Sequence, residues 1–582
     1  MTKSPGAILA AEGRPEGRGT GTGPRTLSRR QFMALGASSF LAPGMLLAAA
    51  DELDTAYTNA RVWTGVPGAP IAKALGVKGA RIAAVDEAAV KAKTGKRTRI
   101  VDLEGAFVVP GFVDGHVHFL LAAATLTPPD LRHANTREEF VRRVAEAARQ
   151  LPAGEWMRGG SWDAELWGGE LPTRQWIDAV TPQTPVALAR LDQHMWLVNS
   201  LALRLAGIDK NTPEPAGGRI IRDANGEPTG VVIDKAQGLL ERVIPPPSDA
   251  AVRRMMKAGI EHGLRNGVTQ AHSMGLDWDT HNALLRLRKE GETDMRFFSF
   301  VPLSDWEKLA DIVKRDGRGD DWVRWGGLKA LADGSLGSRT ALFYKPYDDQ
   351  PGTHGIRVNT LEHLREWLTQ ADRHDMNVSI HAIGDEANDD VLNLYEAVAK
   401  ANGPRDRRFR IEHAQHLTDA AMGRFARQNV IASVQPYHAI DDGRWAIQRI
   451  GAERLKRTYA FKSLIDTGAH VCFGSDWPVA PFAPLTGIAA AVLRQTIDGK
   501  NPGGWMPEQR ITVEQALTAY TAENAYAGFQ EDRLGRLVPG YLADLVVLDK
   551  DLLRIDPRQL DSAKVLRTVV DGKERFVAES AR

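Results

Sequence analysis

The 582-residue sequence contains a single cysteine, Cys472. No disulfide can form within the chain, and zinc sites built from several cysteines are excluded. No apolar run approaches the roughly 18 residues that a membrane-spanning helix needs, so we expect no stable insertion into a membrane. Neither sign of charge is in excess, because the sequence has 74 basic and 73 acidic residues and a net charge of +1. This balance argues against a nucleic-acid partner.

The first 50 residues have the features of an export signal. Paired arginines in Ser28-Arg29-Arg30-Gln31-Phe32-Met33 precede a weakly apolar stretch over 34–47, and three alanines follow at 48–50. These features are typical of a twin-arginine signal peptide. We therefore expect the twin-arginine export machinery as a partner, cleavage near Ala50, and a periplasmic or secreted protein. A disordered tail with a short apolar segment is the alternative.

Both ends of the remaining chain are rich in short strand-like segments. Residues 51–107 and 536–582 show short apolar runs separated by turn signals such as Asp571-Gly572. We expect them to form one composite β-sandwich, with two separate β caps as the alternative. Between them, residues 108–535 alternate strand-like and helix-like segments, which indicates a parallel sheet with crossover helices.

Eight candidate strands can be counted in this middle part. They lie at 107–113, 268–272, 295–301, 327–332, 377–381, 409–412, 430–434 and 470–473. Eight is the number of strands in a TIM barrel, so the predicted fold class is α/β with a (β/α)8 barrel. The first crossover is too long for one helix. We expect an inserted α/β subdomain there, at about 150–245, with strands at 185–191, 218–222 and 230–233.

Polar residues follow several expected strands at the end where barrel enzymes carry their active sites. His116 and His118 are two apart on extended chain, so both imidazoles point to one side and can share a metal ion. Others end or follow the fourth, fifth, sixth and eighth strands: Lys329, His381, His413 and Asp476. Imidazole and carboxylate ligands suit a divalent cation, and zinc is the ion we expect.

Eight motifs in this sequence belong together. They are PGFVDGHVH (110–118), PTRQWID (172–178), GLKALADGSLGSRTA (327–341), HAIGDEAN (381–388), IEHAQHL (411–417), SVQPYH (433–438), GSDWPV (474–479) and GRLVPGYLADLVVLD (535–549). With this set the chain resembles the metal-dependent amidohydrolase superfamily, in particular its amidohydrolase-3 or YtcJ-like branch, which includes N-substituted formamide deformylases. The resemblance covers about residues 54–575 and implies the sandwich and the barrel. It says little about the substrate.

The resemblance also implies a role for each residue of the metal site. The more buried metal would be held by His116, His118 and Asp476, and the second by His381 and His413. If two metals are bound rather than one, Lys329 would bridge them as a carbamate made with CO2. His272, near the end of the second strand, is interpreted as structural.

These ligand types predict hydrolysis by a metal-activated hydroxide. A bound divalent cation lowers the pKa of water from about 15.7 toward 7. The hydroxide would attack the carbonyl of an amide-like small molecule, while Asp476 passes the proton to the leaving nitrogen. Candidates to orient the ligating histidines are Asp114, Asp385 and Glu412. We therefore predict an enzyme, a metal-dependent amidohydrolase acting on carbon–nitrogen bonds other than peptide bonds.

Other functions remain open at this point. An esterase, a deacetylase or a cyclic-amide hydrolase would use the same site, and a non-catalytic exported binding protein is a further alternative. The complete ligand set argues against the binding protein. The sequence has neither a G-x-S-x-G nucleophile elbow nor a G-x-x-x-x-G-K-[ST] loop, so serine-hydrolase and P-loop chemistry are not expected.

The insertion carries five tryptophans, at Trp156, Trp162, Trp167, Trp176 and Trp196. Such side chains offer large rigid apolar surface. The insertion is therefore predicted to act as a lid that recognises an apolar or aromatic group on the substrate, with formation of its own core as the alternative. The expected substrate-binding residues are Arg190 and His194 in the insertion and Gln435 and His438 after the seventh strand.

Overall fold

The protein is described here by a computed structural model that covers residues 52–581, apart from 127, 133, 153, 191–194 and 216–217. The paired arginines at 29–30 and the expected cleavage position after residue 50 lie outside the described residues. None of the helices in the described part of the chain is long and apolar enough to cross a membrane.

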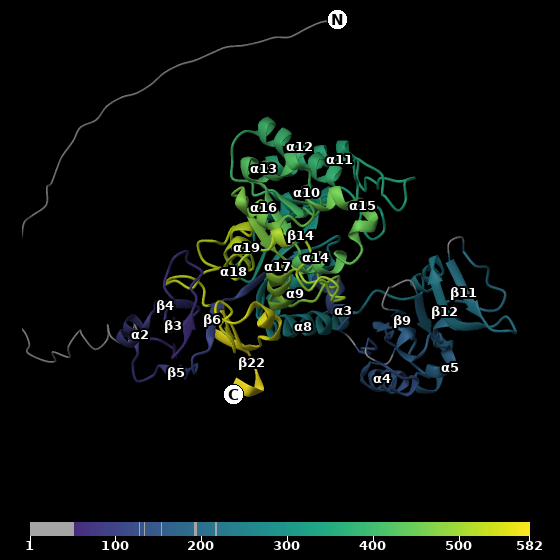
Figure 1. The fold of residues 1–582 in the computed structure, drawn as a ribbon. Helices are drawn as coiled ribbons and strands as arrows, with labels where there is room; N and C mark the ends of the chain where they lie inside the picture. Colours follow the sequence, from purple (N-terminus) through teal and green to yellow (C-terminus); the bar gives the residue numbers. More distant parts are fainter. Residues whose placement is uncertain are drawn as a thin grey trace, which may run out of the picture. The chain divides into compact units, whose positions relative to one another are not determined.

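Eight parallel strands form one sheet that nearly closes on itself. Figure 1 shows the ribbon of the chain coloured along the sequence. In sequence order the eight strands are β7 (Phe112–Val117), β13 (Val268–Met274), β14 (Arg296–Pro302), β15 (Val323–Leu331), β16 (Asn377–Ala382), β17 (Arg410–His413), β18 (Ile431–Val434) and β19 (Val471–Phe473). Neighbouring strands pair in this order, and a parallel bridge between Val117 and Trp477 links the first strand to the segment after the last. This confirms the predicted (β/α)8 barrel.

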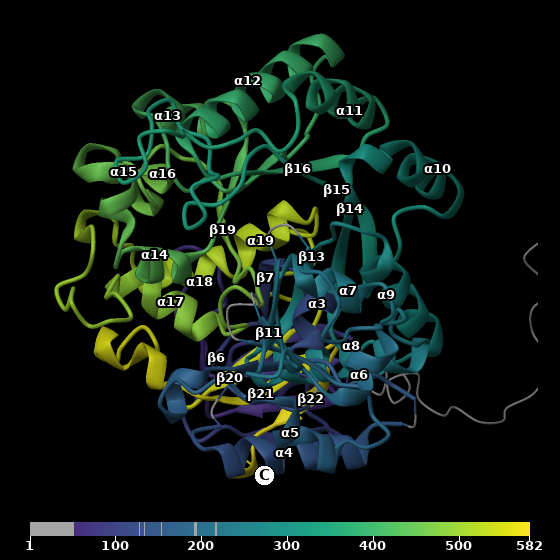
Figure 2. The same ribbon diagram turned by 90° about the vertical axis from the view of Figure 1, so that its right-hand side faces the viewer.

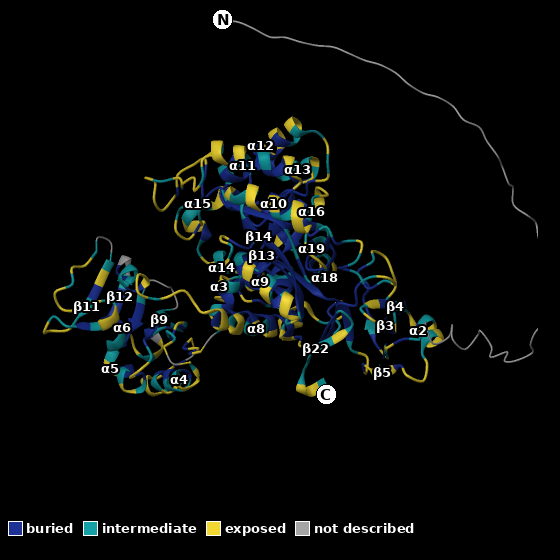
Figure 3. Ribbon diagram, turned by 180° about the vertical axis from the view of Figure 1, so that it is seen from behind, coloured by how far each residue is buried: buried dark blue, intermediate teal, exposed yellow. Residues whose placement is uncertain are grey.

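Helices surround the barrel strands (Figure 2). They are α3 (Phe119–Ala124), α8 (Asp249–Arg265), α9 (Asp279–Glu290), α10 (Trp306–Asp316), α11 (Leu361–Arg373), α12 (Asp385–Asn402), α13 (Asp419–Gln428), α14 (Pro436–Asp442), α15 (Ala446–Leu455), α16 (Phe461–Asp466), α17 (Pro484–Leu493), α18 (Val513–Ala519) and α19 (Ala522–Ala527). Helices α8, α11 and α13 each begin after a hydroxyl side chain that accepts a hydrogen bond from the first turn, which stabilises the helix start. The barrel strands are buried, whereas the outer faces of the helices are exposed (Figure 3).

The first barrel strand begins later than expected. The predicted strand at 107–113 is in fact two strands, because Phe107–Pro110 is β6 of another sheet and β7 starts only at Phe112. The break falls at Gly111, where a Cβ would lie 2.2 Å from Oγ1 of Thr269 on β13. Only glycine lets the two strands approach so closely.

Two further sheets are built from the ends of the described chain. The first has the order β4 (Arg81–Val85), β3 (Leu75–Lys78), β1 (Thr55–Thr58), β5 (Arg99–Asp102), and α2 (Glu87–Lys93) follows β4. The second has the order β2 (Arg61–Val62), β6, β20 (Leu545–Leu548), β21 (Val565–Val570), β22 (Lys573–Val577). Because β6 pairs with β20, segments near both ends of the described chain share one sheet.

The insertion between β7 and β13 contains a sheet of its own. Its order is β11 (Gly218–Arg222), β12 (Pro228–Asp234), β10 (Met195–Val198), β9 (Ala187–Arg190), β8 (Gly160–Trp162). Four helices accompany it: α4 (Arg137–Gln150), α5 (Arg174–Ile177), α6 (Ser200–Leu205) and α7 (Gly238–Glu241).

The tryptophans of the insertion pack inside it. Trp162, Trp176 and Trp196 are 0%, 5% and 7% exposed and belong to its own hydrophobic cores. Trp156 and Trp167 pack against the same cores. Trp162, Trp176 and Trp196 are therefore core residues of the insertion, as the alternative expected, and a lid role for the insertion stays a prediction.

Candidate metal centre

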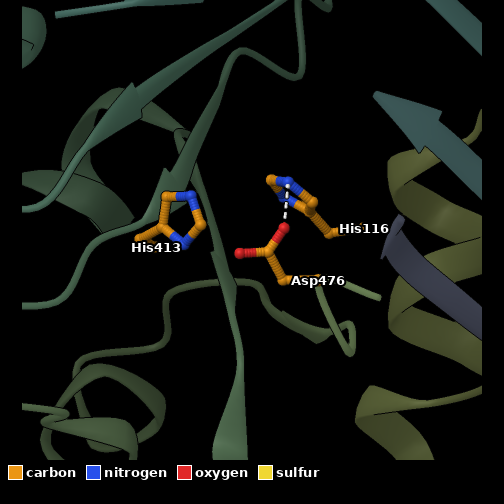
Figure 4. Close-up of side chains that lie close together, drawn as sticks. All are labelled: His116, His413 and Asp476. Atoms are coloured by element: carbon orange, nitrogen blue, oxygen red, sulfur yellow. Dashed lines mark ion pairs between the residues drawn. The ribbon is translucent and has the colours of Figure 1, made fainter. Parts of the chain in front are cut away.

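Three predicted ligands meet at the carboxyl end of the barrel strands (Figure 4). His116 lies on β7, His413 ends β17, and Asp476 follows β19. One ligand atom from each lies within 4.8 Å of the others, and all three residues are buried. Nε2 of His116 is 3.3 Å from Oδ1 of Asp476, and the rings of His116 and His413 are 5.0 Å apart.

The other expected metal ligands lie next to these three residues. Nε2 of His118 is 3.4 Å from the same Oδ1 of Asp476. The ring of His381 lies 4.5 Å from that of His413. Lys329 is 3% exposed and makes no hydrogen bond or ion pair with any described residue. Its amine is thus buried beside the cluster without a neutralising contact.

In three histidines of the cluster, one imidazole nitrogen is hydrogen-bonded to a neighbouring group. Nδ1 of His116 lies 2.6 Å from Oε2 of Glu412, and Nδ1 of His413 lies 2.7 Å from Oε1 of Gln435. Nε2 of His381 lies 2.9 Å from the main-chain oxygen of Gly334. Because all three partners are acceptors, each held nitrogen carries the proton and the other keeps its lone pair for a ligand.

A divalent cation fits the atoms that are present. Among the described residues, Nε2 of His116 and Oδ1 of Asp476 are buried without a hydrogen-bond partner. Leaving such atoms unsatisfied costs about 1–3 kcal/mol each. A cation between them would satisfy both, and imidazole nitrogen with carboxylate oxygen is a donor set that zinc accepts.

Burial and neighbouring charges set the protonation of the cluster. Burial, and then the charge of Lys329, lower the pKa of His116 to about 4. Burial lowers the pKa of Lys329 to about 8. Burial alone would raise the pKa of Asp476, but the neighbouring imidazoles of His116 and His118 outweigh it and hold that pKa well below its usual range. Neutral imidazoles, an ionised carboxylate and a lysine that gives up its proton readily are all suited to metal binding.

The backbone at two of these residues is unusual. His413 and Asp476 have φ values of 75° and 61°, in the left-handed region that residues with a Cβ rarely adopt. Such conformations cost of order 1–3 kcal/mol and cluster at functional sites. Here they occur at the last residue of β17 and shortly after the end of β19, where both side chains join the cluster.

The four predicted substrate-binding residues lie in different surroundings or outside the described residues. Oε1 of Gln435 accepts a hydrogen bond from Nδ1 of His413, so Gln435 contacts an expected metal ligand. His438 on α14 places its Nε2 3.8 Å from Oδ2 of Asp476, and its ring stacks 6.1 Å from that of His413. Arg190 is paired with Asp163 of the insertion at 3.3 Å. His194 lies outside the described residues.

Of the three acids expected to orient histidines, one does so. Glu412 holds His116, whereas Asp114 accepts hydrogen bonds from the backbone N–H groups of His116 and Ser475. Asp385 accepts from the backbone N–H of Tyr344 and touches no ligand. A further buried residue, Arg410, was not anticipated, although its position two before Glu412 on one strand places both side chains on the same face.

Comparison with known proteins agrees with this geometry. The profile of the Amidohydrolase family matches residues 99–576. Protein LONG AFTER FAR-RED 3 of Arabidopsis thaliana is 40% identical over 90% of this chain and 91% of its own. N-substituted formamide deformylase of Arthrobacter pascens is 29% identical over 90% and 98%. A solved structure of an uncharacterized metal-dependent hydrolase from Pyrococcus furiosus superposes with a TM-score of 0.72 at 29% identity, over 86% of this chain and all of that one.

Proposed function

The chain belongs to the amidohydrolase family, and from that premise we propose that it is a metal-dependent hydrolase cleaving a carbon–nitrogen bond, other than a peptide bond, in small amide-like molecules. The observation that carries the proposal is a pair of buried ligand atoms without hydrogen-bond partners, Nε2 of His116 and Oδ1 of Asp476, beside His413. The similarity to an N-substituted formamide deformylase supports the carbon–nitrogen bond. The donor set supports zinc.

The residues of the cluster divide the chemistry between them. A divalent cation at His116, His118, His381, His413 and Asp476 would supply a Lewis acid and an activated water. Asp476, whose pKa is held low by its neighbours, takes the proton from the attacking water and delivers it to the leaving nitrogen. His438, whose Nε2 is buried near Asp476 without a hydrogen-bond partner, is placed to hydrogen-bond the substrate.

Lys329 is the residue we propose as a bridge between two cations. Its pKa, lowered by burial to about 8, gives it a larger fraction of the neutral amine that reacts with CO2 than an ordinary lysine has. The nitrogen lone pair forms a bond to the carbon of CO2, and the nitrogen then loses a proton to solvent. The product is a carbamate anion, which removes the positive charge that would otherwise face two cations.

Exposed apolar side chains support a substrate with an apolar group. Leu121, Leu276 and Val479 are 65%, 52% and 66% exposed. They follow β7, β13 and β19, which are neighbours around the barrel, at the end that carries the metal ligands. Burying a substituent there would contribute about 2 kcal/mol, or about thirtyfold in kcat/KM.

A hydrolysis screen tests the reaction. The purified zinc-loaded protein is offered N-formyl amines, N-acetyl amines, cyclic amides and esters, each as a pair with a benzyl or a methyl substituent. We expect N-formyl amines to be cleaved, the benzyl member faster, and cleavage to stop on chelation and return with zinc. Faster cleavage of esters or cyclic amides would show that the enzyme acts on the ester or cyclic amide bond instead. Turnover that survives complete metal removal would exclude the metal-dependent reaction.

We also propose that the protein is exported through the twin-arginine machinery to the periplasm or beyond. The support is the arginine pair Arg29-Arg30 ahead of an apolar stretch. The test replaces both arginines by lysine and follows the chain by fractionation and N-terminal sequencing. Export and cleavage near Ala50 should be lost in the variant. An uncleaved, cytoplasmic wild-type chain would refute the proposal.

A further inference from the structure

Arg410 is a fully buried cation in the barrel interior, next to the metal-site cluster. Its Nε lies 2.8 Å from Oε1 of Glu412. Its Nη2 donates to the main-chain oxygen of Gly115 at 2.7 Å and to Oγ of Ser433 at 2.9 Å. Its Nη1 lies 2.9 Å from Nδ1 of His272. A single guanidinium therefore joins strands β7, β13, β17 and β18.

The carboxylate that Arg410 contacts is the one that holds His116. Oε1 of Glu412 faces Arg410 and also accepts a hydrogen bond from the hydroxyl of Ser379 on β16, while Oε2 faces Nδ1 of His116 at 2.6 Å. Both carboxylate oxygens are thereby occupied. Arg410 and Ser379 fix Oε1 of the Glu412 carboxylate. The orientation of Oε2 toward the imidazole of His116 is thereby fixed as well.

Arg410 also hydrogen-bonds the main chain of β7, the strand that carries His116. The carbonyl of Gly115, which it binds, precedes His116 directly in β7. The same guanidinium thus determines where the backbone of His116 lies and, through Glu412, which way the ring is turned. A lysine could not make these contacts together, because only the planar fork of arginine presents several donors in fixed directions.

We propose that Arg410 is the positioning residue of the metal centre, and that it sets the affinity and geometry of the cation bound through Nε2 of His116. The inference rests on the proposed function, since it needs His116 to be a ligand. It also assigns a role to His272. Because Arg410 can only donate, Nδ1 of His272 is an acceptor, and this histidine orients the guanidinium instead of binding the metal.

Cobalt(II) binding to the purified chain tests the inference without any substrate. The dissociation constant and the visible absorption spectrum, which reports ligand geometry, are compared between the wild type, Arg410→Met and Arg410→Lys. Loss of such supporting contacts weakens metal binding about 10–100-fold. We expect this loss with an altered spectrum for Arg410→Met, and a smaller loss for Arg410→Lys, which keeps the charge without the fork.

Arg407→Met is the matched control. Arg407 is also buried and forms a two-bond ion pair with Asp372, at 2.9 and 3.1 Å, but it contacts no residue of the metal site. This variant should unfold at lower temperature with an unchanged cobalt affinity. Folded Arg410 variants with wild-type affinity and spectrum would overturn the inference alone. If Arg410→Met does not fold, Arg410→Lys decides by the same readings. A wild-type chain that binds no cobalt would overturn the proposed metal site as well.

Discussion

Single residues around the cluster hold its histidines in three different ways. An anionic carboxylate holds His116, a neutral amide holds His413, and a main-chain carbonyl holds His381. A carboxylate makes the facing imidazole a stronger base than a neutral acceptor does. We therefore expect His116 to contribute most to the affinity for the cation.

Replacing His116 or His413 by alanine should remove bound metal and most of the activity. Loss of Lewis-acid stabilisation costs several kcal/mol, and about 4 kcal/mol corresponds to a factor of about 1,000 in kcat. Metal content by elemental analysis and kcat on the best substrate of the screen measure both effects. The exposed His363 on α11 offers a control, since His363→Ala should change neither quantity. Either ligand variant retaining wild-type metal content would show that the ligand set is assigned wrongly.

Replacing Lys329 by alanine should lower the metal content from two ions per chain to one. The carbamate that bridges them can no longer form, and the second site keeps only His381 and His413 of the expected set. Wild-type protein in 13C-labelled bicarbonate should show a carbamate carbon signal that the variant lacks. The comparison variant is Lys308→Ala, whose ammonium lies over the ring of Trp278. One metal per wild-type chain and no carbamate signal would rule out the bridge.

At the scale of elements, the strand ends could be predicted because they carry local patterns. An HxH pair on extended chain, and strands followed at once by His or Asp, placed His116, His413 and Asp476 correctly at one end of the barrel. Seven of the eight expected strands overlap barrel strands closely. The first did not, because 107–113 is one continuous apolar run whose change of sheet at Gly111 depends on contact with the distant β13.

Other features depend on contacts that no local pattern reveals. The role of Arg410 needs the positions of β7, β13 and β18, which are far apart in the sequence. The tryptophans of the insertion were ambiguous, because the same residues suit a binding surface or a core. Only their burial distinguishes the two.

The contact between the barrel and the sheet that contains β20 and β21 offers a prediction for stability. Arg296 on β14 is buried and binds Asp544 through two hydrogen bonds, at 2.7 and 3.0 Å, and Asp571 at 3.0 Å. Arg296→Met leaves Asp544 buried without its partner and should lower the free energy of unfolding by about 3–5 kcal/mol. Urea unfolding measures the change. Arg575→Met breaks the pair with Asp294, which is 48% exposed, and should cost about 1 kcal/mol or less. Equal losses in the two variants would mean that burial of the pair is unimportant.

For the whole molecule, buried histidines outside the ligand set couple stability to pH. Burial lowers the pKa of His281 to about 4 and that of His416 to about 3, from an ordinary value of 6.5. The unfolded chain therefore binds protons at these residues before the folded chain does. Their contribution to stability is complete above pH 6.5 and is lost as the pH falls from there toward about 4 for His281 and about 3 for His416.

His281 allows this effect to be isolated, because it lies on α9 away from the metal ligands and hydrogen-bonds Ser299 at 3.2 Å. In the wild type, His281 alone should lower the free energy of unfolding by about 1 kcal/mol between about pH 6.5 and 5.5. His281→Gln cannot titrate, so its stability deficit relative to the wild type should shrink by that amount over the same interval. Urea unfolding of both proteins at a series of pH values measures the difference, in which all other titrating groups cancel. His363→Gln on the surface should track the wild type throughout. A deficit for His281→Gln that stays constant with pH would show that the buried ring is not neutral in the folded protein.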